Sequence, residues 1–297
     1  MHVPVLTEEL IELLDPKENE NFIDCTLGNG GHANMILEKT GPKGKLLGID
    51  WDAGAVRTAG ANLKSSGLID RAILVQDNFA NMQEIATKEK FYTIHGILFD
   101  LGFSTSQMED AERGFSFQKD GPLDMRYGAA NPVTAEKIVN YWSRPELERI
   151  LKTYGEERFW RQIADAIVQE RSLRQITRTR QLVLIVERAV QKHFLRSRIH
   201  PATRTFQALR IATNNELENL EQGLAAALSL VTEGGKIAVI SFHSLEDRIV
   251  KRFFKDTSSL KPITKKPKIA SPKEVRINPK ARSAKLRVAV KQQTLPS

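Results

Sequence analysis

The sequence predicts an α/β protein in which a doubly wound, mostly parallel sheet is interrupted by an all-helical insertion. Short apolar runs, rich in aliphatic and β-branched residues, alternate with segments of helical periodicity. Near-continuous apolar strands between helices are typical of a parallel sheet that is covered on both faces. The expected strands are NFIDC (21–25), KLLGID (45–50), AILVQD (72–77), IHGILFD (94–100) and GKIAVISF (235–242).

The strand rhythm stops after Asp100 and resumes only at the fifth run, which indicates an insertion between the fourth and fifth strands. We expect residues 108–205 to form a helical subdomain with its own small core, because its segments have apolar faces. Residues 1–107 and 206–297 are then expected to form the sheet domain. The expected helices cover 134–142, 144–155, 156–171, 177–194 and, as one long helix, 203–231.

The composition is that of an ordinary globular chain, with 297 residues, 41% of them hydrophobic and 27% charged. No apolar run approaches the roughly 18 residues that a membrane span needs. Glu8, Glu9 and Glu12 lie where a signal peptide would be basic and then apolar, so we expect no export. Cys25 is the only cysteine and the histidines lack ligand spacing, so no metal is expected. These features predict a reduced, cytoplasmic protein.

Positive charge is concentrated toward the C-terminus. From Lys255 to Ser297 there are twelve Lys and Arg residues against Asp256 and Glu274, a net charge of +10, whereas the whole chain carries +8. Such a tail is either a solvated, partly flexible segment or a basic strip that neutralises nucleic-acid phosphates. Apolar and basic residues alternate in SAKLRVAVK (283–291), which predicts a strand with one polar face. That strand would anchor the tail as an RNA-contacting arm.

The turn GNGGHA (28–33) follows the first expected strand directly and leads into a helix. Its glycines permit positive φ angles and let a ligand approach the backbone closely. Gly28, Gly30 and Ala33 fit the dinucleotide pattern G-x-G-x-x-A, so NAD is one candidate cofactor. Asp50 ends the second strand, where a carboxylate can accept hydrogen bonds from ribose hydroxyls. Because NAD and S-adenosylmethionine both carry an adenosine ribose, these features fit either cofactor.

The ends of the later strands favour S-adenosylmethionine. Asp77, Asn78 and Phe79 follow the third strand and suit the edge and face of an adenine ring, and Asp100 ends the fourth strand. An acidic edge with no Lys or Arg in the glycine turn suits a cationic nucleoside and repels a pyrophosphate. An NAD-dependent oxidoreductase and a non-catalytic RNA-binding scaffold are the alternatives.

Several longer motifs resemble those of one known family. They are HVPVLTEEL, DCTLGNGGH, FDLGFSTSQ, ERGFSFQKDGPLDMR, YGEERF, HPATRTFQALRI, ISFHSLEDRIVK and NPKARSAKLR, in this order from His2 to Arg287. In these motifs the chain is similar to the bacterial 16S rRNA cytosine-N4 methyltransferases, the MraW family. The resemblance implies a Rossmann-like, S-adenosylmethionine-dependent methyltransferase with an inserted substrate-recognition domain. It also implies N4-methylation of one cytidine in the decoding region of 16S rRNA in the small ribosomal subunit, position 1402 in the usual numbering.

The resemblance carries the family's cofactor contacts onto individual residues of this sequence. They are Gly30, Gly31, His32, Asp50, Phe79, Asp100 and Gln107. Asp100 is also the candidate catalytic residue, because it is placed to orient the amine of the target base or the cofactor. The loop before Gln107 departs from the family pattern, since Phe103 replaces a valine and Thr105-Ser106 replaces Ser-Pro. This loop is therefore expected to be less rigid than in the family.

Two further groups of polar residues have both a structural and a functional interpretation. His243, Ser244 and Asp247 are the residue types of a nucleophilic triad, but their spacing favours Ser244 as the N-cap of a helix. The second group lies on one side of an expected helix and consists of Arg204, Gln207 and Arg210. It forms either a solvated face or an RNA contact.

Overall fold

The computed structural model describes residues 4–190 and 200–293, and it divides into two compact units. The sheet unit consists of Met1–Gly102 and Leu217–Ser297, and the helical unit of Phe103–Glu216. The boundaries expected from the sequence, after residues 107 and 205, differ from this division because both fall inside helices, α5 (Thr105–Glu109) and α10 (Ala202–Asn214). No helix within the described ranges has the length and apolar character to cross a bilayer.

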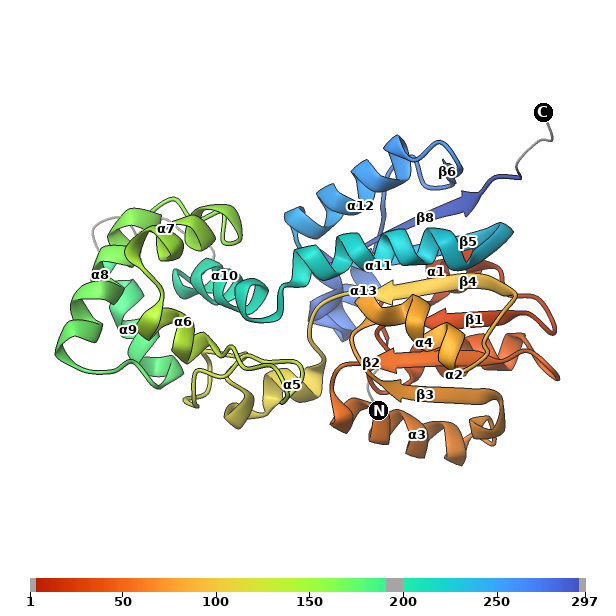
Figure 1. The fold of residues 1–297 in the computed structure, drawn as a ribbon, viewed down its shortest axis with the longest axis horizontal. Coiled ribbons are helices and arrows are strands. Elements are labelled where there is room, and N and C mark those ends of the chain that lie inside the picture. Colours follow the sequence, from red (N-terminus) through yellow and green to blue (C-terminus); the bar gives the residue numbers. More distant parts are fainter. Residues whose placement is uncertain (1–3, 191–199, 294–297) are drawn as a thin grey trace. The chain divides into compact units, whose positions relative to one another are not determined.

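The sheet unit contains the expected α/β sheet, and all five predicted runs form strands (Figure 1). These are β1 (Asn21–Asp24), β2 (Leu46–Asp50), β3 (Ala72–Gln76), β4 (Ile94–Asp100) and β5 (Val231–Ser241). They pair in parallel in the order β3-β2-β1-β4-β5. The chain therefore adds strands on one side of β1 and then returns to its other side, where β4 pairs with it. This reversal makes the β1–β4 edge a topological switch point, where open α/β sheets bind ligands.

Helices cover both faces of the sheet because alternate residues of each strand point to opposite sides. Ile97 and Phe99 of β4 contribute to one apolar cluster, and Leu98 to another. The first cluster includes residues of α4 (Met82–Lys88), α11 (Glu216–Leu230) and α12 (Ser244–Asp256). The second includes residues of α1 (Thr7–Leu14), α2 (Gly31–Lys39), α3 (Ala53–Ser65) and α13 (Pro272–Ile277). Short 3-10 turns occur at η1 (Ile69–Arg71), η2 (Phe79–Asn81) and η5 (Pro279–Ser283).

The C-terminal strand β8 (Lys285–Lys291) was expected to have one polar face, and this expectation is wrong. It lies antiparallel to β5 and also pairs with β6 (Leu260–Pro262) and β7 (Lys268–Ile269), so it is an interior strand. Arg287 is only 8% exposed, and its Nε donates a hydrogen bond of 2.6 Å to Asp247 of α12. The basic residue on the supposed polar face is therefore an internal ion-pair partner.

The helical unit has a single apolar core formed by its own helices. Besides α5 and α10, these are α6 (Ala135–Tyr141), α7 (Arg144–Thr153), α8 (Trp160–Leu173) and α9 (Thr179–Val190), with a 3-10 turn η3 (Ala111–Arg113). The helix expected to continue to residue 194 runs into residues 191–199, which lie outside the described ranges. The single helix expected over 203–231 is wrong, because Asn215 adopts a left-handed conformation with φ 48° and separates α10 from α11. Asparagine tolerates this conformation better than most residues.

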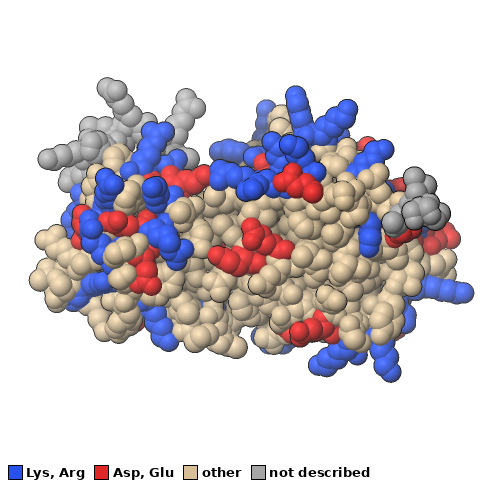
Figure 2. Space-filling view, turned by 45° about the horizontal axis from the view of Figure 1, so that its top comes forward, with Lys and Arg blue, Asp and Glu red and all other residues tan. Residues whose placement is uncertain are grey.

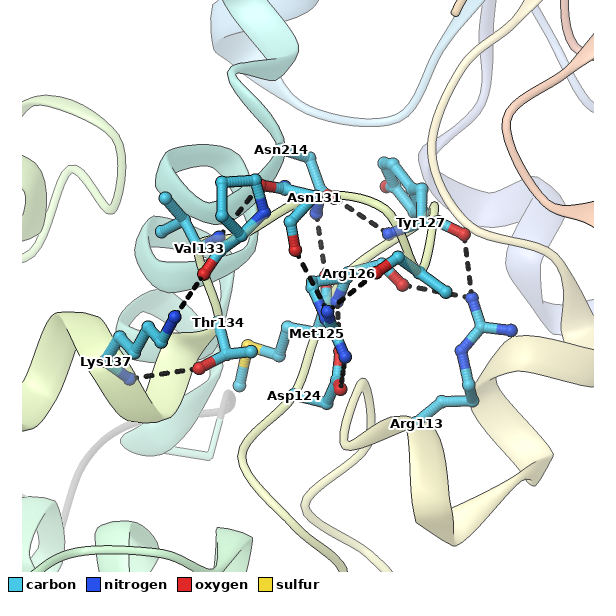
Figure 3. Close-up of polar contacts among 12 residues, drawn as sticks. Arg113, Asp124, Met125, Arg126, Tyr127, Asn131, Val133, Thr134, Lys137 and Asn214 are labelled. Atoms are coloured by element: carbon cyan, nitrogen blue, oxygen red, sulfur yellow. Dashed lines mark hydrogen bonds and ion pairs between the residues drawn. The ribbon is translucent and has the colours of Figure 1, made fainter. Parts of the chain in front are cut away.

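Asn214, immediately before this break, is part of a polar network in the helical unit (Figure 3). Its side chain accepts a hydrogen bond from the backbone N–H of Tyr127 and donates one to the carbonyl of Met125, each at 2.8 Å. The guanidinium of Arg126 binds Asp124 and the carbonyls of Ala129 and Asn131. The arginine of the LDMR motif thus closes its own loop, and Asn214 ties that loop to α10.

Candidate active site

Three carboxyl groups lie at the carboxyl ends of adjacent strands in the sheet unit. Asp24 ends β1, Asp50 ends β2 and Asp100 ends β4. Because β1 pairs in parallel with both β2 and β4, the three strand ends meet at one edge of the sheet. The sequence had marked Asp50 and Asp100 as site residues, and the topology places Asp24 between them.

The glycine turn is held against the end of β2 by Asp50. The Oδ2 atom of Asp50 accepts a hydrogen bond of 2.8 Å from the backbone N–H of Gly28, and Oδ1 accepts another of 2.8 Å from that of Asp52. Gly28 has φ 52° and Gly30 has φ 80°, a conformation that favours glycine. Gly30 precedes α2 directly, so the turn presents the N-terminus of that helix at the same edge.

Gly31 has a packing role in addition to the expected cofactor contact. It is the first residue of α2, and a Cβ atom at this position would overlap the ring of Pro4. The next two residues of the N-terminal segment continue this contact. The carbonyl of Val5 lies 3.1 Å from Nε2 of His32, and the N–H of Leu6 donates to Glu274 of α13. The N-terminal segment therefore packs on the start of α2.

His32 lies on the first turn of α2, is 5% exposed, and faces Asp100. Its Nδ1 atom is 3.7 Å from Oδ2 of Asp100. The backbone N–H of Asp100 donates a 2.6 Å hydrogen bond to Oγ1 of Thr26, and the N–H of Thr26 donates to Oδ1 of Asp24. Thr26 therefore links the carboxyl group of Asp24 to the backbone of Asp100. Neither Thr26 nor Asp24 was predicted as a site residue, although the position of Asp24 at a strand end was a signal for it.

Both of these carboxyl groups hold their protons more tightly than usual. Burial, reinforced by the neighbouring charge of Asp24, raises the pKa of Asp100 to about 8. Burial also raises the pKa of Asp24 to about 7, with a contribution from Asp50 and an opposing one from the N–H of Thr26. Carboxyl groups with raised pKa values at a ligand-binding edge are typical of functional sites.

Phe79 lies directly after β3, as predicted, and its ring packs at the edge of the apolar core. It makes an edge-to-face contact with Phe99 at 5.4 Å, and a Cβ atom on Gly223 of α11 would overlap it. Asp77 accepts hydrogen bonds from the N–H of Asn78 and the amide of Asn81, so the segment after β3 is a well-ordered turn. Phe79 is thus held in one orientation, as a stacking surface must be.

Gln107 is the one predicted cofactor contact that belongs to the helical unit. Its Oε1 accepts from the backbone N–H of Ser104 at 2.9 Å, while its own N–H donates to Oγ of Ser104 at 3.2 Å. The two residues form a capping box at the start of α5, which the pattern S-x-x-Q encodes. Phe103, next to this box, stacks on Phe115 at 5.7 Å. A cofactor contact by Gln107 remains a prediction.

The structure corrects the N-cap predicted at Ser244. The N-cap of α12 is His243, whose Nδ1 accepts a hydrogen bond from the N–H of Glu246. The carboxylate of Glu246 in turn accepts hydrogen bonds from the N–H groups of His243 and Phe242. Asp247 binds Arg287 and Lys285 instead of the histidine. These contacts explain the polar residues of SFHSLED as a helix start and an ion pair.

The three polar residues of α10 are half-buried and have partners within the helical unit, and an RNA contact by them remains a prediction. Arg204 donates to the carbonyl of Glu156, and Gln207 donates to the carbonyl of Tyr154. Arg210 makes a two-pronged ion pair with Glu216, with N–O distances of 2.8 and 2.9 Å. All three tie α10 to neighbouring segments of the helical unit.

The residues at the sheet edge fit S-adenosylmethionine. The Oδ1 atom of Asp100 is buried and has no hydrogen-bond partner among the described residues. Because buried polar atoms normally have a partner, we expect a donor on a bound ligand to fill this place. A Cβ atom at Gly28 would meet only the carbonyl of Thr26, at 3.8 Å, which leaves room above the turn. Acceptors on a carboxylate-rich edge suit the hydroxyl and ammonium donors and the positive charge of this cofactor.

A doubly wound sheet with a glycine turn after β1 and carboxylates after β2 and β4 defines a Rossmann-like methyltransferase that uses S-adenosylmethionine. Within this class, the chain belongs to the MraW methylase family, which it matches over residues 1–292. The family membership excludes the NAD-dependent oxidoreductase and the non-catalytic scaffold as alternatives.

Relatives match the chain over nearly its whole length. "Ribosomal RNA small subunit methyltransferase H" of Trichlorobacter lovleyi is 45% identical, with 98% of each chain covered. The protein of the same name from Symbiobacterium thermophilum is 44% identical, covering 98% of this chain and 97% of the relative. An rRNA methylase structure from Streptococcus thermophilus aligns over 99% of each chain with a TM-score of 0.48 and 10% identity.

Proposed function

We propose that this methyltransferase modifies the RNA of the small ribosomal subunit, at N4 of one cytidine in the decoding region of 16S rRNA. The names of the relatives support the class of RNA, because they describe small-subunit rRNA methyltransferases at 44 to 45% identity. The choice of base and position follows from the resemblance of the motifs. A ribosomal substrate also implies a cytoplasmic location.

The sheet edge supplies the groups that would hold the cofactor. Asp50 is the acceptor for the ribose hydroxyls, while Gly30 and Gly31 contribute backbone groups at the start of α2. His32 lies beside Asp100, with its Nδ1 atom 3.7 Å from Oδ2. Phe79 offers a fixed aromatic ring next to the end of β3, suited to an adenine face. When bound, S-adenosylmethionine supplies an electrophilic methyl group on a positively charged sulfur.

The unpartnered Oδ1 atom of Asp100 is the observation that carries the assignment to an amine substrate. The exocyclic amine of cytosine is a weak nucleophile, because its lone pair is delocalised into the ring. A carboxylate that accepts a hydrogen bond from this amine turns the lone pair out of the ring plane and stabilises the positive charge that develops on nitrogen. Because its pKa is raised to about 8, Asp100 accepts a proton readily once it is ionised, and the positive charge of the bound cofactor favours that ionised form.

The target base has to leave its stack to reach a carboxylate at the end of a strand. We assign recognition of the surrounding RNA in part to the helical unit, as an inserted substrate-recognition domain. Its aromatic residues Tyr154 and Trp160 lie next to cations, with Arg161 4.4 Å above the ring of Trp160. Aromatic and cationic groups of this kind suit unpaired bases and phosphates.

The decisive experiment is mass mapping of 16S rRNA from cells that lack this protein. We expect one cytidine of the decoding region to lose its N4-methyl group and to regain it when the wild-type gene is returned. The Asp100→Asn variant should restore the modification poorly although the protein accumulates normally. An unchanged modification map in the deletion strain would refute the proposed substrate.

A further inference from the structure

One face of α12 carries a continuous row of exposed cations. Arg248, Lys251, Arg252 and Lys255 follow one another at i, i+3, i+4 and i+7, and all four are exposed. Residues at this spacing share one side of a helix, so the row spans roughly 10 Å along its axis. The opposite side of α12 packs into the core through Val250 and Phe254. We call the four cations the α12 basic row.

Figure 2 shows Lys and Arg side chains gathered over α12 in the sheet unit. Lys251, Arg252 and Lys255 form no ion pair with any carboxylate that the structure describes. Of the acidic residues of the helix, Asp247 is already bound to Arg287 and Lys285, and Asp256, beside Lys255, forms no ion pair with the described residues of the row. Some cations of the helical unit differ from the row: Arg144 and Arg174, for example, pair with carboxylates.

Like charges three and four residues apart weaken a helix, and the α12 basic row contains four such pairs. Lys255 lies in the last turn, where a cation suits the helix dipole, but the repulsion among the four cations opposes folding. A polyanion that lies along the helix would turn the mutual repulsion into attraction. The charge of the row thus favours binding over stability.

The α12 basic row starts close to the candidate active site. Helix α12 begins three residues after β5, and the end of β5 pairs with the end of β4, where Asp100 pairs with Ile240. The N–H of Leu101 also donates to the carbonyl of Ile240 at 2.9 Å. The first turn of α12 therefore lies at the edge that carries Asp100, and the row extends from there along the sheet unit.

We propose that the α12 basic row binds the phosphate backbone of the substrate RNA beside the target nucleotide and holds it at the active-site edge. The proposal rests on the proposed function for the identity of the RNA. The row contacts phosphates and reads no base, so it contributes affinity and position but not sequence specificity. Three of its four cations precede the basic C-terminal segment, which begins at Lys255.

The test compares two triple variants that remove the same charge. The first is K251Q/R252Q/K255Q. The control is K43Q/K45Q/K88Q, which changes exposed lysines close to the amino ends of β2 and β4, opposite the active-site edge. Affinity is measured over a range of salt concentrations for a 16S rRNA fragment with the decoding region and for an unrelated RNA of equal length. Calorimetry with S-adenosylmethionine and thermal unfolding check the fold of both variants.

We expect the α12 variant to lose roughly ten- to a hundredfold in affinity near 0.1 M salt, equally for both RNAs, and its salt slope to fall by about two units. Its cofactor affinity should be unchanged, and its melting temperature should not fall, since repulsion is relieved. The control should keep most of the wild-type slope. Equal slopes in the two variants would overturn the proposal even if the wild type methylates the fragment. If the wild type does not methylate the fragment, the proposed function is wrong. The comparison of the two salt slopes then still tests whether the α12 basic row binds RNA.

Discussion

Replacement of Asp50 by alanine tests the cofactor assignment most directly. In the folded protein this carboxylate accepts hydrogen bonds from the N–H groups of Gly28 and Asp52, each at 2.8 Å. It therefore holds the glycine turn against the end of β2 and, in the proposed complex, also binds the ribose. Asp50→Ala removes both functions, and two separate measurements can distinguish them.

The magnitudes follow from the donors that lose their acceptor. A buried donor without a partner costs about 1 to 3 kcal/mol. Because the side chain of Asp50 is partly exposed, water can replace it at the two N–H groups, so we expect a loss of about 2 kcal/mol in the free energy of unfolding. The missing ribose contacts should weaken binding of S-adenosylmethionine by roughly 1 to 3 kcal/mol, or about 5- to 150-fold.

Urea unfolding gives the first quantity and isothermal titration calorimetry the second, at a temperature where the variant is folded. The control is Asp52→Ala, which removes the N-cap hydrogen bond from Gly54 at 2.7 Å and should cost about 1 kcal/mol of stability. We expect this control to bind the cofactor like the wild type. If Asp50→Ala is destabilised but binds with unchanged affinity, Asp50 only supports the turn and the assignment is wrong.

Three further changes test other parts of the structure. Burial and Asp24 raise the pKa of Asp100 to about 8, so this group stabilises the fold most below its ordinary pKa and loses that contribution as the pH rises through 8. Ionised Asp100 attracts the positive charge of the cofactor, so the affinity for S-adenosylmethionine should rise by up to about tenfold per pH unit between about pH 6 and 8. Calorimetry at several pH values measures this rise. The affinity of the Asp100→Asn variant should not change over the same range. Asp247→Ala should lower the free energy of unfolding by about 3 kcal/mol, because it leaves the nearly buried Arg287 without its partner; a loss below 1 kcal/mol in urea unfolding would contradict this. The variant K265Q/K266Q/K268Q neutralises three exposed lysines of the tail. If the tail contacts phosphates, RNA affinity and its salt slope should both fall; if the tail is solvated, both should stay at wild-type values.

The strands of the sheet could be predicted from the sequence because their burial on both faces leaves a direct signal. Each of the first four apolar runs ends within one residue of its strand in the structure. The separation of α10 from α11 left no such signal, because the apolar period continues on both sides of Asn215. The break depends on Asn214, whose amide binds Met125 and Tyr127 nearly 90 residues earlier in the chain. A window of local sequence contains no information about that contact.

The same distinction applies to the candidate site. Glycines at positive φ and carboxylates at strand ends are local features, and Gly30, Asp50 and Asp100 lie in such positions. The neighbours that set their properties come from elsewhere. Asp24 shifts the pKa of Asp100 across the β1–β4 pairing, and the Pro4 ring restricts Gly31 from the N-terminal segment. Such effects follow from the sheet order, which sequence periodicity does not determine.

Charge shows most clearly what a count along the sequence misses. The basic C-terminal segment is one block in sequence, yet the structure places Arg287 inside the sheet unit while Lys265 and Lys266 stay exposed. Three of the four cations of the α12 basic row precede that block, so the count overlooked them. In the sheet unit, carboxylates gather at the strand ends and cations line the helix that starts at the same edge. Opposite charges at one edge suit a cationic methyl donor and a polyanionic acceptor, and each set of charges repels the ligand of the other. This separation would direct the two substrates to adjacent but different places, as direct transfer of a methyl group requires.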